Sequence, residues 1–305
     1  MEFKPKESYS LYGRIDAFNT SDGIINMAVT LMDDTGINIK VNETNSLEIG
    51  KVYLFNFTCL FNGTRNQLIL NSYKDALCCQ LCEEVYAVYK KFYPYVPVGI
   101  KALEDKLDMY IDMIDNRIIK TLVMDIFSRY RHDFLLYPAA VKMHHNYIGG
   151  LAYHSLTMCD LALGFGNIYE NLDRDYLLAG ALLHDIAKVI EFNSPIATEY
   201  SVKGQLLGHL VLGAMELDRT AGRLGLRDTE EVLILEHMIL SHHGQPQFGA
   251  CKKPETPEAL ILWILDTIDS KMRVIDDTFP NVNEGDFSDA LGVLDRMKFY
   301  KKKEN

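Results

Sequence analysis

The sequence has no apolar run of the roughly 18 to 20 residues that a helix needs to cross a bilayer. No apolar segment of the kind found in secretory signals follows the first six residues. Paired CxxC motifs, which are typical of zinc ribbons, are also missing. These absences argue against a membrane-spanning or secreted protein, and we expect a soluble cytoplasmic chain with no membrane partner.

Positive charge is scarce, since the chain has 31 Lys and Arg and 42 Asp and Glu, which gives a net charge of −11. A surface that attracts nucleic acid everywhere is therefore excluded, although a locally basic groove is compatible with this balance. The six cysteines include one CxxC, Cys79 to Cys82. Without a second pair, free thiols on a packed helix are favoured over a structural zinc site.

Two patterns divide the 305 residues. From about residue 8 to 73, short β-rich runs alternate with turns such as Ser21-Asp22-Gly23, which predicts five strands. Five strands in about 70 residues suit a small closed barrel of the OB-fold type. The strands are expected at 9–15, 24–31, 36–41, 51–57 and 67–70.

After Lys74 the apolar residues recur with a helical period, interrupted by Pro94 and Pro97. The predicted fold is therefore multidomain, with an N-terminal all-β OB-fold-like barrel followed by an all-α helical bundle. Helices are expected at about 75–92, 100–130, 150–170, 174–189, 204–224, 228–241 and 256–274.

Histidines and aspartates are distributed over five of these predicted helices in a distinctive order. An adjacent His-Asp pair offers two ligands to a metal, and imidazole with carboxylate suits divalent first-row metals. Any one of these histidines is more often an ordinary hydrogen-bonded residue, but the whole series favours a metal site, and its size suggests two ions. The candidate ligands are His154, His184, Asp185, His209, His242, His243 and Asp266.

Four further polar residues accompany this series. His144 and His145 precede a glycine-hinged entry to the His154 helix, where they would line the pocket or bind a substrate phosphate. Lys188 is either a fixed cation for phosphate or a surface lysine beside the ligands. Asp269 lies three residues after a candidate ligand and would either orient a ligand or compete with it.

The order and context of these motifs resemble the metal-binding signature of the HD-domain phosphohydrolases. A longer series of segments resembles the YhaM-type 3′→5′ exoribonucleases, which pair an OB-fold with an HD domain. The segments are His144-His145-Asn146-Tyr147-Ile148-Gly149-Gly150, His184-Asp185-Ile186-Ala187-Lys188, Gly204-Gln205-Leu206-Leu207-Gly208-His209 and Ser241-His242-His243-Gly244.

The resemblance implies a manganese-dependent phosphodiesterase in which a metal-activated water attacks the phosphodiester. Iron, cobalt, nickel and zinc suit the same ligands. Asp185 and Lys188 would be catalytic, with Asp185 bridging two ions and Lys188 contacting the scissile phosphate. The first ion would be held by His154, His184, Asp185 and Asp266, and the second by His209, His242 and His243.

The resemblance also implies four segments: a nucleic-acid-binding barrel (1–74), a helical linker and support (75–130), the HD domain (131–295) and a basic tail (296–305). The barrel would hold single-stranded RNA, with single-stranded DNA as another substrate, and Tyr12 and Arg14 would contact it. Other aromatic residues would either stack bases or fill the barrel core. The remaining candidates are Phe18, Tyr53, Phe55 and Phe57 for bases, and Lys40, Lys51 and Arg65 for phosphates.

Two other functions stay open at this point. The first is hydrolysis of a small nucleotide or cyclic dinucleotide, with a regulatory barrel. The second is a non-catalytic nucleic-acid-binding protein, although the intact ligand series argues against it. A homo-oligomer is compatible with the sequence, and the basic run 296–303 is expected to be a frayed, solvated tail.

Overall fold

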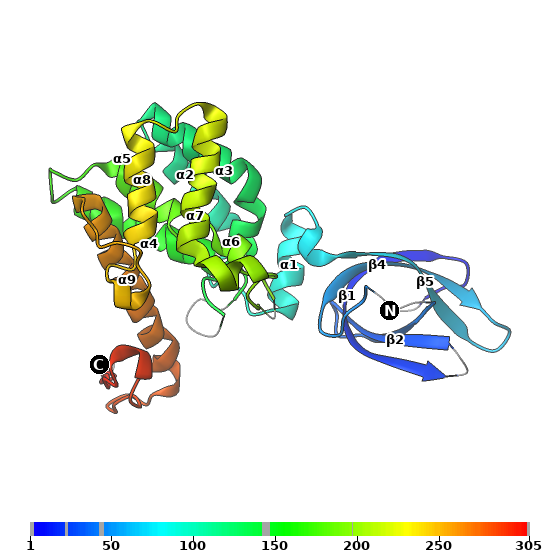
Figure 1. Cartoon of the computed structure of the whole chain (residues 1–305). Coiled ribbons are helices and arrows are strands. Elements are labelled where there is room, and N and C mark those ends of the chain that lie inside the picture. The colour runs from blue at the N-terminus through cyan, green and yellow to red at the C-terminus, as the bar shows by residue number, and fades with distance from the viewer. Residues whose placement is uncertain (1–2, 22–23, 43–45, 142–146, 197, 304–305) are drawn as a thin grey trace. The chain divides into compact units, whose positions relative to one another are not determined.

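The computed structural model describes all residues except 1–2, 22–23, 43–45, 142–146, 197 and 304–305. The described chain divides into two compact units, residues 1–94 and 95–305 (Figure 1). Within the described part, the helices are all too short or too polar to traverse a bilayer. The finer division into four segments stays a prediction.

The first unit contains a closed barrel with the strand order β1-β2-β3-β5-β4. All neighbouring strands pair antiparallel except β3 and β5, which are parallel. The predicted five-stranded barrel is therefore confirmed. Its strands are β1 (Ser8–Ser21), β2 (Ile24–Leu31), β3 (Gly36–Val41), β4 (Val52–Phe61) and β5 (Asn66–Asp75).

Alternate side chains along each strand point inward and fill the barrel. In β4, every second residue from Tyr53 to Cys59 is buried, because successive side chains point to opposite faces of a strand. Phe55 and Phe57 are fully buried in the core cluster, together with Ile39 and Met27. Of the two roles open to these phenylalanines, the structure shows core packing rather than base stacking.

The helix expected at 75–92 is wrong in its first part. Asp75 accepts a hydrogen bond from the Leu77 backbone, which closes the short 3-10 helix η1 (Ala76–Cys78) instead of an α-helix. The chain is extended at Cys82, and α1 (Glu83–Phe92) begins after it. The Tyr89 hydroxyl donates to the Ala76 carbonyl at 2.8 Å and ties α1 back to η1.

The second unit is helical, as predicted. The single helix expected at 100–130 is instead two, because the Asn116 side chain accepts hydrogen bonds from Ile118 N and Ile119 N and starts a new helix. The helices are α2 (Ile100–Asp112), α3 (Arg117–Leu136), α4 (Gly150–Gly166), α5 (Arg174–Leu183), α6 (Lys188–Glu191), α7 (Val202–Leu224), α8 (Glu230–Ser241) and α9 (Pro257–Thr278), with the 3-10 helices η2 (Pro246–Phe248), η3 (Phe279–Asn281) and η4 (Gly292–Leu294).

Helix α5 lies at the centre of this unit. Every residue from Leu177 to Leu183 is buried, and α3, α4, α8 and α9 pack around the helix. Gly180 permits this close packing, because a Cβ there would clash with Met238 of α8. The C-terminal end of α5 consequently lies in the interior of the bundle, where side chains from several helices can meet.

The C-terminal run is not a frayed tail. Met297 and Tyr300 form isolated β-bridges with Leu291 and Phe287. The Lys301 ammonium donates to the carbonyls of Phe279 and Val282, both at 2.8 Å. The expectation of a solvated tail is therefore wrong for the described residues, because backbone pairing that the sequence pattern does not reveal holds the run in place.

Candidate metal centre

Two histidines occupy equivalent positions at helix ends. His184 is the C-cap of α5 and His242 is the C-cap of α8. Each ring donates from Nδ1 to a carbonyl of its own last turn, to Ala181 O at 2.9 Å and to Ile239 O at 2.7 Å. These carbonyls have no helical partner, so the bonds satisfy them and leave each Nε2 pointing away from its helix.

The helix expected at 174–189 is also interrupted. Helix α5 ends at Leu183, residues 184–187 form turns, and α6 begins at Lys188. The turn places Asp185 beside Lys188, whose ammonium lies 2.6 Å from Asp185 Oδ2. Lys188 therefore forms an ion pair with Asp185 and is not a surface lysine beside the ligands.

His154 comes from the middle of α4 and faces α9. Its Nδ1 lies 2.6 Å from Asp269 Oδ2, and its Nε2 lies 3.4 Å from Asp266 Oδ1. Burial on its own would lower the pKa of His154, but the bonds to both aspartates raise it to about 10. Of the two roles open to Asp269, the geometry supports orientation of a ligand, since it holds the ring nitrogen opposite the cluster.

The remaining two histidines approach from α7 and from the turn after α8. His209 Nδ1 lies 3.1 Å from both carboxylate oxygens of Glu191. His243 Nδ1 donates to the Phe248 carbonyl at 2.9 Å. Gly244 allows the turn, because its φ is 75° and a side chain there would clash with the Trp263 ring. The ring centroids of His209 and His243 lie 5.2 Å apart.

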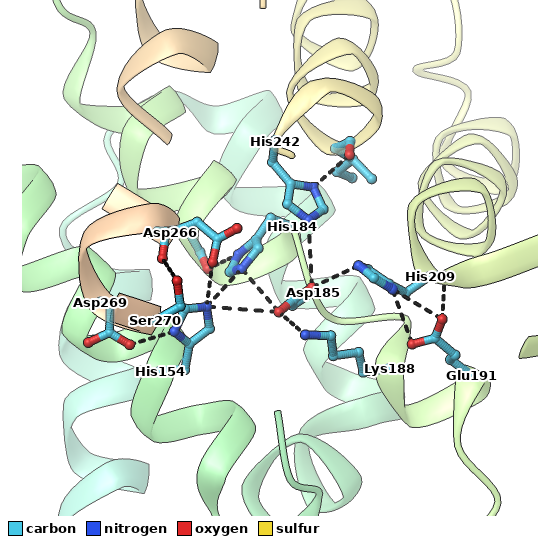
Figure 2. Close-up of polar contacts among 12 residues, drawn as sticks. His154, His184, Asp185, Lys188, Glu191, His209, His242, Asp266, Asp269 and Ser270 are labelled. Carbon is cyan, nitrogen blue, oxygen red and sulfur yellow. Dashed lines mark hydrogen bonds and ion pairs between the residues drawn. The ribbon is translucent and has the colours of Figure 1, made fainter. Parts of the chain in front are cut away.

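The ligand atoms gather in two groups, each with its atoms within 4.8 Å of one another. Figure 2 shows Asp185 with His154 and His184 on one side, His209 on the other and His242 above it. The groups are His154, His184 and Asp185, and His209, His242 and His243.

Asp185 is shared between the two groups through its separate oxygens. Oδ2 lies 3.3 Å from His184 Nε2 and 3.9 Å from His154 Nε2. Oδ1 lies 3.3 Å from His209 Nε2 and 3.7 Å from His242 Nε2. One carboxylate therefore has an oxygen directed at each group, as a residue bridging two cations requires.

Three buried atoms at this junction lack a hydrogen bond to any of the described residues. They are Asp185 Oδ1, His209 Nε2 and His242 Nε2. Each unsatisfied buried polar atom costs roughly 1–3 kcal/mol, so three at one point need an explanation. A divalent cation accepts electron pairs from all three atoms, and the donor set therefore fits a metal.

Electrostatics keep Asp185 and His242 in their metal-binding forms. Burial alone would raise the pKa of Asp185, but Lys188 and His184 hold it well below its ordinary value. Burial, aided by the neighbouring His184, holds the pKa of His242 well below its ordinary value. For Lys188, burial lowers the pKa but Asp185 more than compensates, so the net shift is upward. The site thus combines an ionised carboxylate, a neutral imidazole and a partly buried cation.

The other expected site residues lie elsewhere. His144 and His145 fall outside the described residues. In the barrel unit, Tyr12 is only 7% exposed, whereas Arg14 is more open and pairs with Asp16 at 3.0 Å. RNA contact by Tyr12 and Arg14 stays a prediction.

A groove of about 710 Å³ lies on the barrel. Two of the expected phosphate contacts, Lys40 and Arg65, line it. Lys40 Nζ donates a hydrogen bond to Gln67 Oε1 at 2.8 Å. Several amide side chains also line it, namely Asn19, Asn26, Asn38, Asn66 and Gln67.

Sequence reasoning missed Glu191. It is buried at 6% exposure in α6 and holds His209. The available signal was its position three residues after Lys188, which places both side chains on one face of a helical turn.

Residues 151–271 match the HD domain family. This segment contains every side chain predicted above as a metal ligand, together with Lys188 and Glu191. The HD domain indicates a metal-dependent phosphohydrolase, and the predicted order of barrel and helical HD domain is confirmed. No solved structure matches the chain.

Proposed function

We propose that this protein is a metal-dependent 3′→5′ exoribonuclease that hydrolyses single-stranded RNA. The observation that carries the proposal is the position of Asp185 between two groups of ligands, with one carboxylate oxygen directed at each. When bound, divalent ions acidify a water molecule and withdraw charge from phosphate oxygens. His154, His184, Asp185 and Asp266 would hold one ion, and His209, His242 and His243 would hold the other, with manganese as the proposed metal.

The protein's own residues have defined tasks in this proposal. Asp185 is ionised and buried, so it anchors both groups of ligands without competition from solvent. Lys188 carries a positive charge on a side chain that is 15% exposed, 2.6 Å from Asp185, and would contact the scissile phosphate as charge develops on it. Asp269 holds His154 through Nδ1, which directs Nε2 at the cluster.

The barrel supports RNA rather than a small nucleotide as substrate. Its groove is large for one nucleotide and combines two cations with amide groups that can bond to bases and phosphates. Closed five-stranded barrels of this class commonly bind oligonucleotides. We therefore propose that Lys40 and Arg65 contact the phosphates of the strand whose 3′ end is hydrolysed.

A 5′-labelled oligoribonucleotide incubated with the full chain and Mn²⁺ tests the proposal. The expected product is a ladder that shortens from the 3′ end. Asp185→Asn should abolish hydrolysis while RNA binding persists, and Asp105→Asn, an exposed residue of α2, serves as the matched control. Intact RNA together with hydrolysis of a cyclic dinucleotide would favour the small-molecule alternative, and unchanged hydrolysis by Asp185→Asn would exclude the proposed site.

A further inference from the structure

The five clustered histidines are held in two different ways. Three of them donate from Nδ1 to a nearby backbone carbonyl, and these are His184, His242 and His243. His154 comes from within α4, where helical hydrogen bonds already occupy the local carbonyls, and His209 follows a break in α7. Each of these two rings is held instead by a carboxylate from another element, Asp269 for His154 and Glu191 for His209.

The contact between Glu191 and His209 depends on a break within α7. Gly208 has φ 70° and ψ 161°, so the helical path is interrupted immediately before His209. A backbone N–H that follows such a break cannot reach the carbonyl of the preceding turn. Glu191 Oε1 accepts this N–H at 3.0 Å and thereby caps the second part of α7 from outside the helix.

The same carboxylate also fixes the His209 ring. Both of its oxygens lie 3.1 Å from His209 Nδ1 (Figure 2). A carboxylate oxygen accepts a hydrogen bond from Nδ1, and in the neutral ring the proton on Nδ1 leaves the lone pair on Nε2. That Nε2 is the buried atom 3.3 Å from Asp185 Oδ1.

Glu191 is itself rigidly placed. Its N–H donates to Ala187 O at 2.8 Å, and its carbonyl accepts from Ser201 N at 2.8 Å. Gly204 brings the start of α7 against this carbonyl, since a Cβ at that position would clash with it. The backbone of α6 and the start of α7 therefore form one anchored unit.

We propose that Glu191 is a positioning residue, which selects the Nδ1-protonated form of His209 and holds its Nε2 toward the second group of metal ligands. This inference rests on the proposed function. It concerns only that second group, because the first group is held by the α5 turn and by Asp269.

The ring state can be measured on metal-free protein. In full-length protein carrying ¹⁵N-labelled histidine at pH 8, long-range ¹H–¹⁵N spectra distinguish the two ring nitrogens. Wild-type His209 should show a single form with the proton on Nδ1. Glu191→Ala should convert it to a mixture, whereas Glu191→Gln, which keeps one acceptor oxygen, should show a smaller change. Glu258→Gln is the matched control, because Glu258 is buried to a similar extent (8% exposed against 6%) but accepts a hydrogen bond from Asp173 N instead of from a metal-ligand candidate.

Calorimetric titration with Mn²⁺ alone tests the consequence. Glu191→Ala should weaken binding of one of two ions by about 10- to 100-fold and leave the other unchanged, as is typical when a residue that orients a ligand is removed. Glu191→Gln should lie between Glu191→Ala and wild type, and it decides the question if Glu191→Ala does not fold. An unchanged ring form and unchanged affinity for both ions would overturn the inference.

These measurements separate the two proposals. If wild-type protein binds two Mn²⁺ ions but leaves RNA intact, the exoribonuclease proposal is wrong. The comparison of the Glu191 variants with wild type would still test the role of Glu191. Wild-type protein that binds no Mn²⁺ would overturn both.

Discussion

Asp185 Oδ1 and His209 Nε2 lie 3.3 Å apart in the interior of the helical unit, and neither atom has a hydrogen-bond partner in the described part of the chain. Asp185 comes from the turn after α5 and His209 from α7. Burying both atoms without a hydrogen-bond partner destabilises the fold. A cation that binds to both atoms removes this cost and therefore stabilises the folded protein.

Metal removal should therefore reduce stability. When the free metal concentration is 100 times the dissociation constant, binding adds about 2.7 kcal/mol to the free energy of unfolding. Chemical denaturation in Mn²⁺ and in excess chelator measures this difference. His242→Ala should reduce it, because that variant loses one of the unpaired ligand atoms. Equal stability in metal and in chelator would contradict a folded-state metal site.

Lys188→Met should separate catalysis from metal binding. The methionine keeps the apolar stem but removes the charge that lies 2.6 Å from Asp185. Loss of one group that stabilises transition-state charge typically lowers kcat by about 10²- to 10³-fold. We expect that loss with unchanged metal content, measured on labelled RNA. Lys101→Met, at an exposed position of α2, should behave as wild type. Unchanged kcat in Lys188→Met would make Lys188 a structural lysine.

Gly208→Ala should destabilise the protein and displace His209. The φ of 70° and ψ of 161° at this position are accessible almost exclusively to glycine, and forcing another residue there costs about 1–3 kcal/mol. Thermal or denaturant unfolding gives the stability change, and Mn²⁺ titration reports the displaced ligand. Gly164→Ala makes the same change at an exposed helical position of α4, where a Cβ meets no atom within 4 Å, and should be neutral or slightly stabilising. Similar behaviour of the two variants would exclude a special role for the break.

His237 should make stability depend on pH independently of the metal site. Its Nε2 accepts a hydrogen bond from Glu255 N at 2.8 Å, and burial lowers its pKa below the ordinary value of 6.5. As the pH falls below about 6.5, His237 is protonated in the unfolded chain before it is protonated in the folded chain. The contribution of neutral His237 to the free energy of unfolding is therefore present above pH 6.5 and is lost below it.

The measurement compares wild type with His237→Gln in chelator, because glutamine keeps an acceptor but does not titrate. The stability advantage of wild type over the variant should shrink between pH 8 and pH 5. A constant difference across this range would show that His237 does not titrate differently in the folded and unfolded chains.

Residue types and local patterns predicted much of this architecture. Short β-rich runs separated by turn residues predicted the barrel, and the structure confirms its five strands. Helix boundaries were less accurate where a polar side chain competes for backbone donors, as Asp75 and Asn116 do. The pairing of the C-terminal run with residues 287 and 291 had no local signal, because it joins segments through backbone groups that every residue carries.

The sequence alone determined which chemistry is available, because the histidines and aspartates between residues 154 and 269 supply the imidazole and carboxylate groups that bind divalent metals. It also determined their order and the helices that carry them. Only the tertiary structure decided how they are shared: that each Asp185 oxygen faces a different group, that Asp269 holds His154, and that Glu191 holds His209. These relationships depend on where α5 ends and where α7 breaks, and the packing of distant helices sets both, which no local pattern encodes.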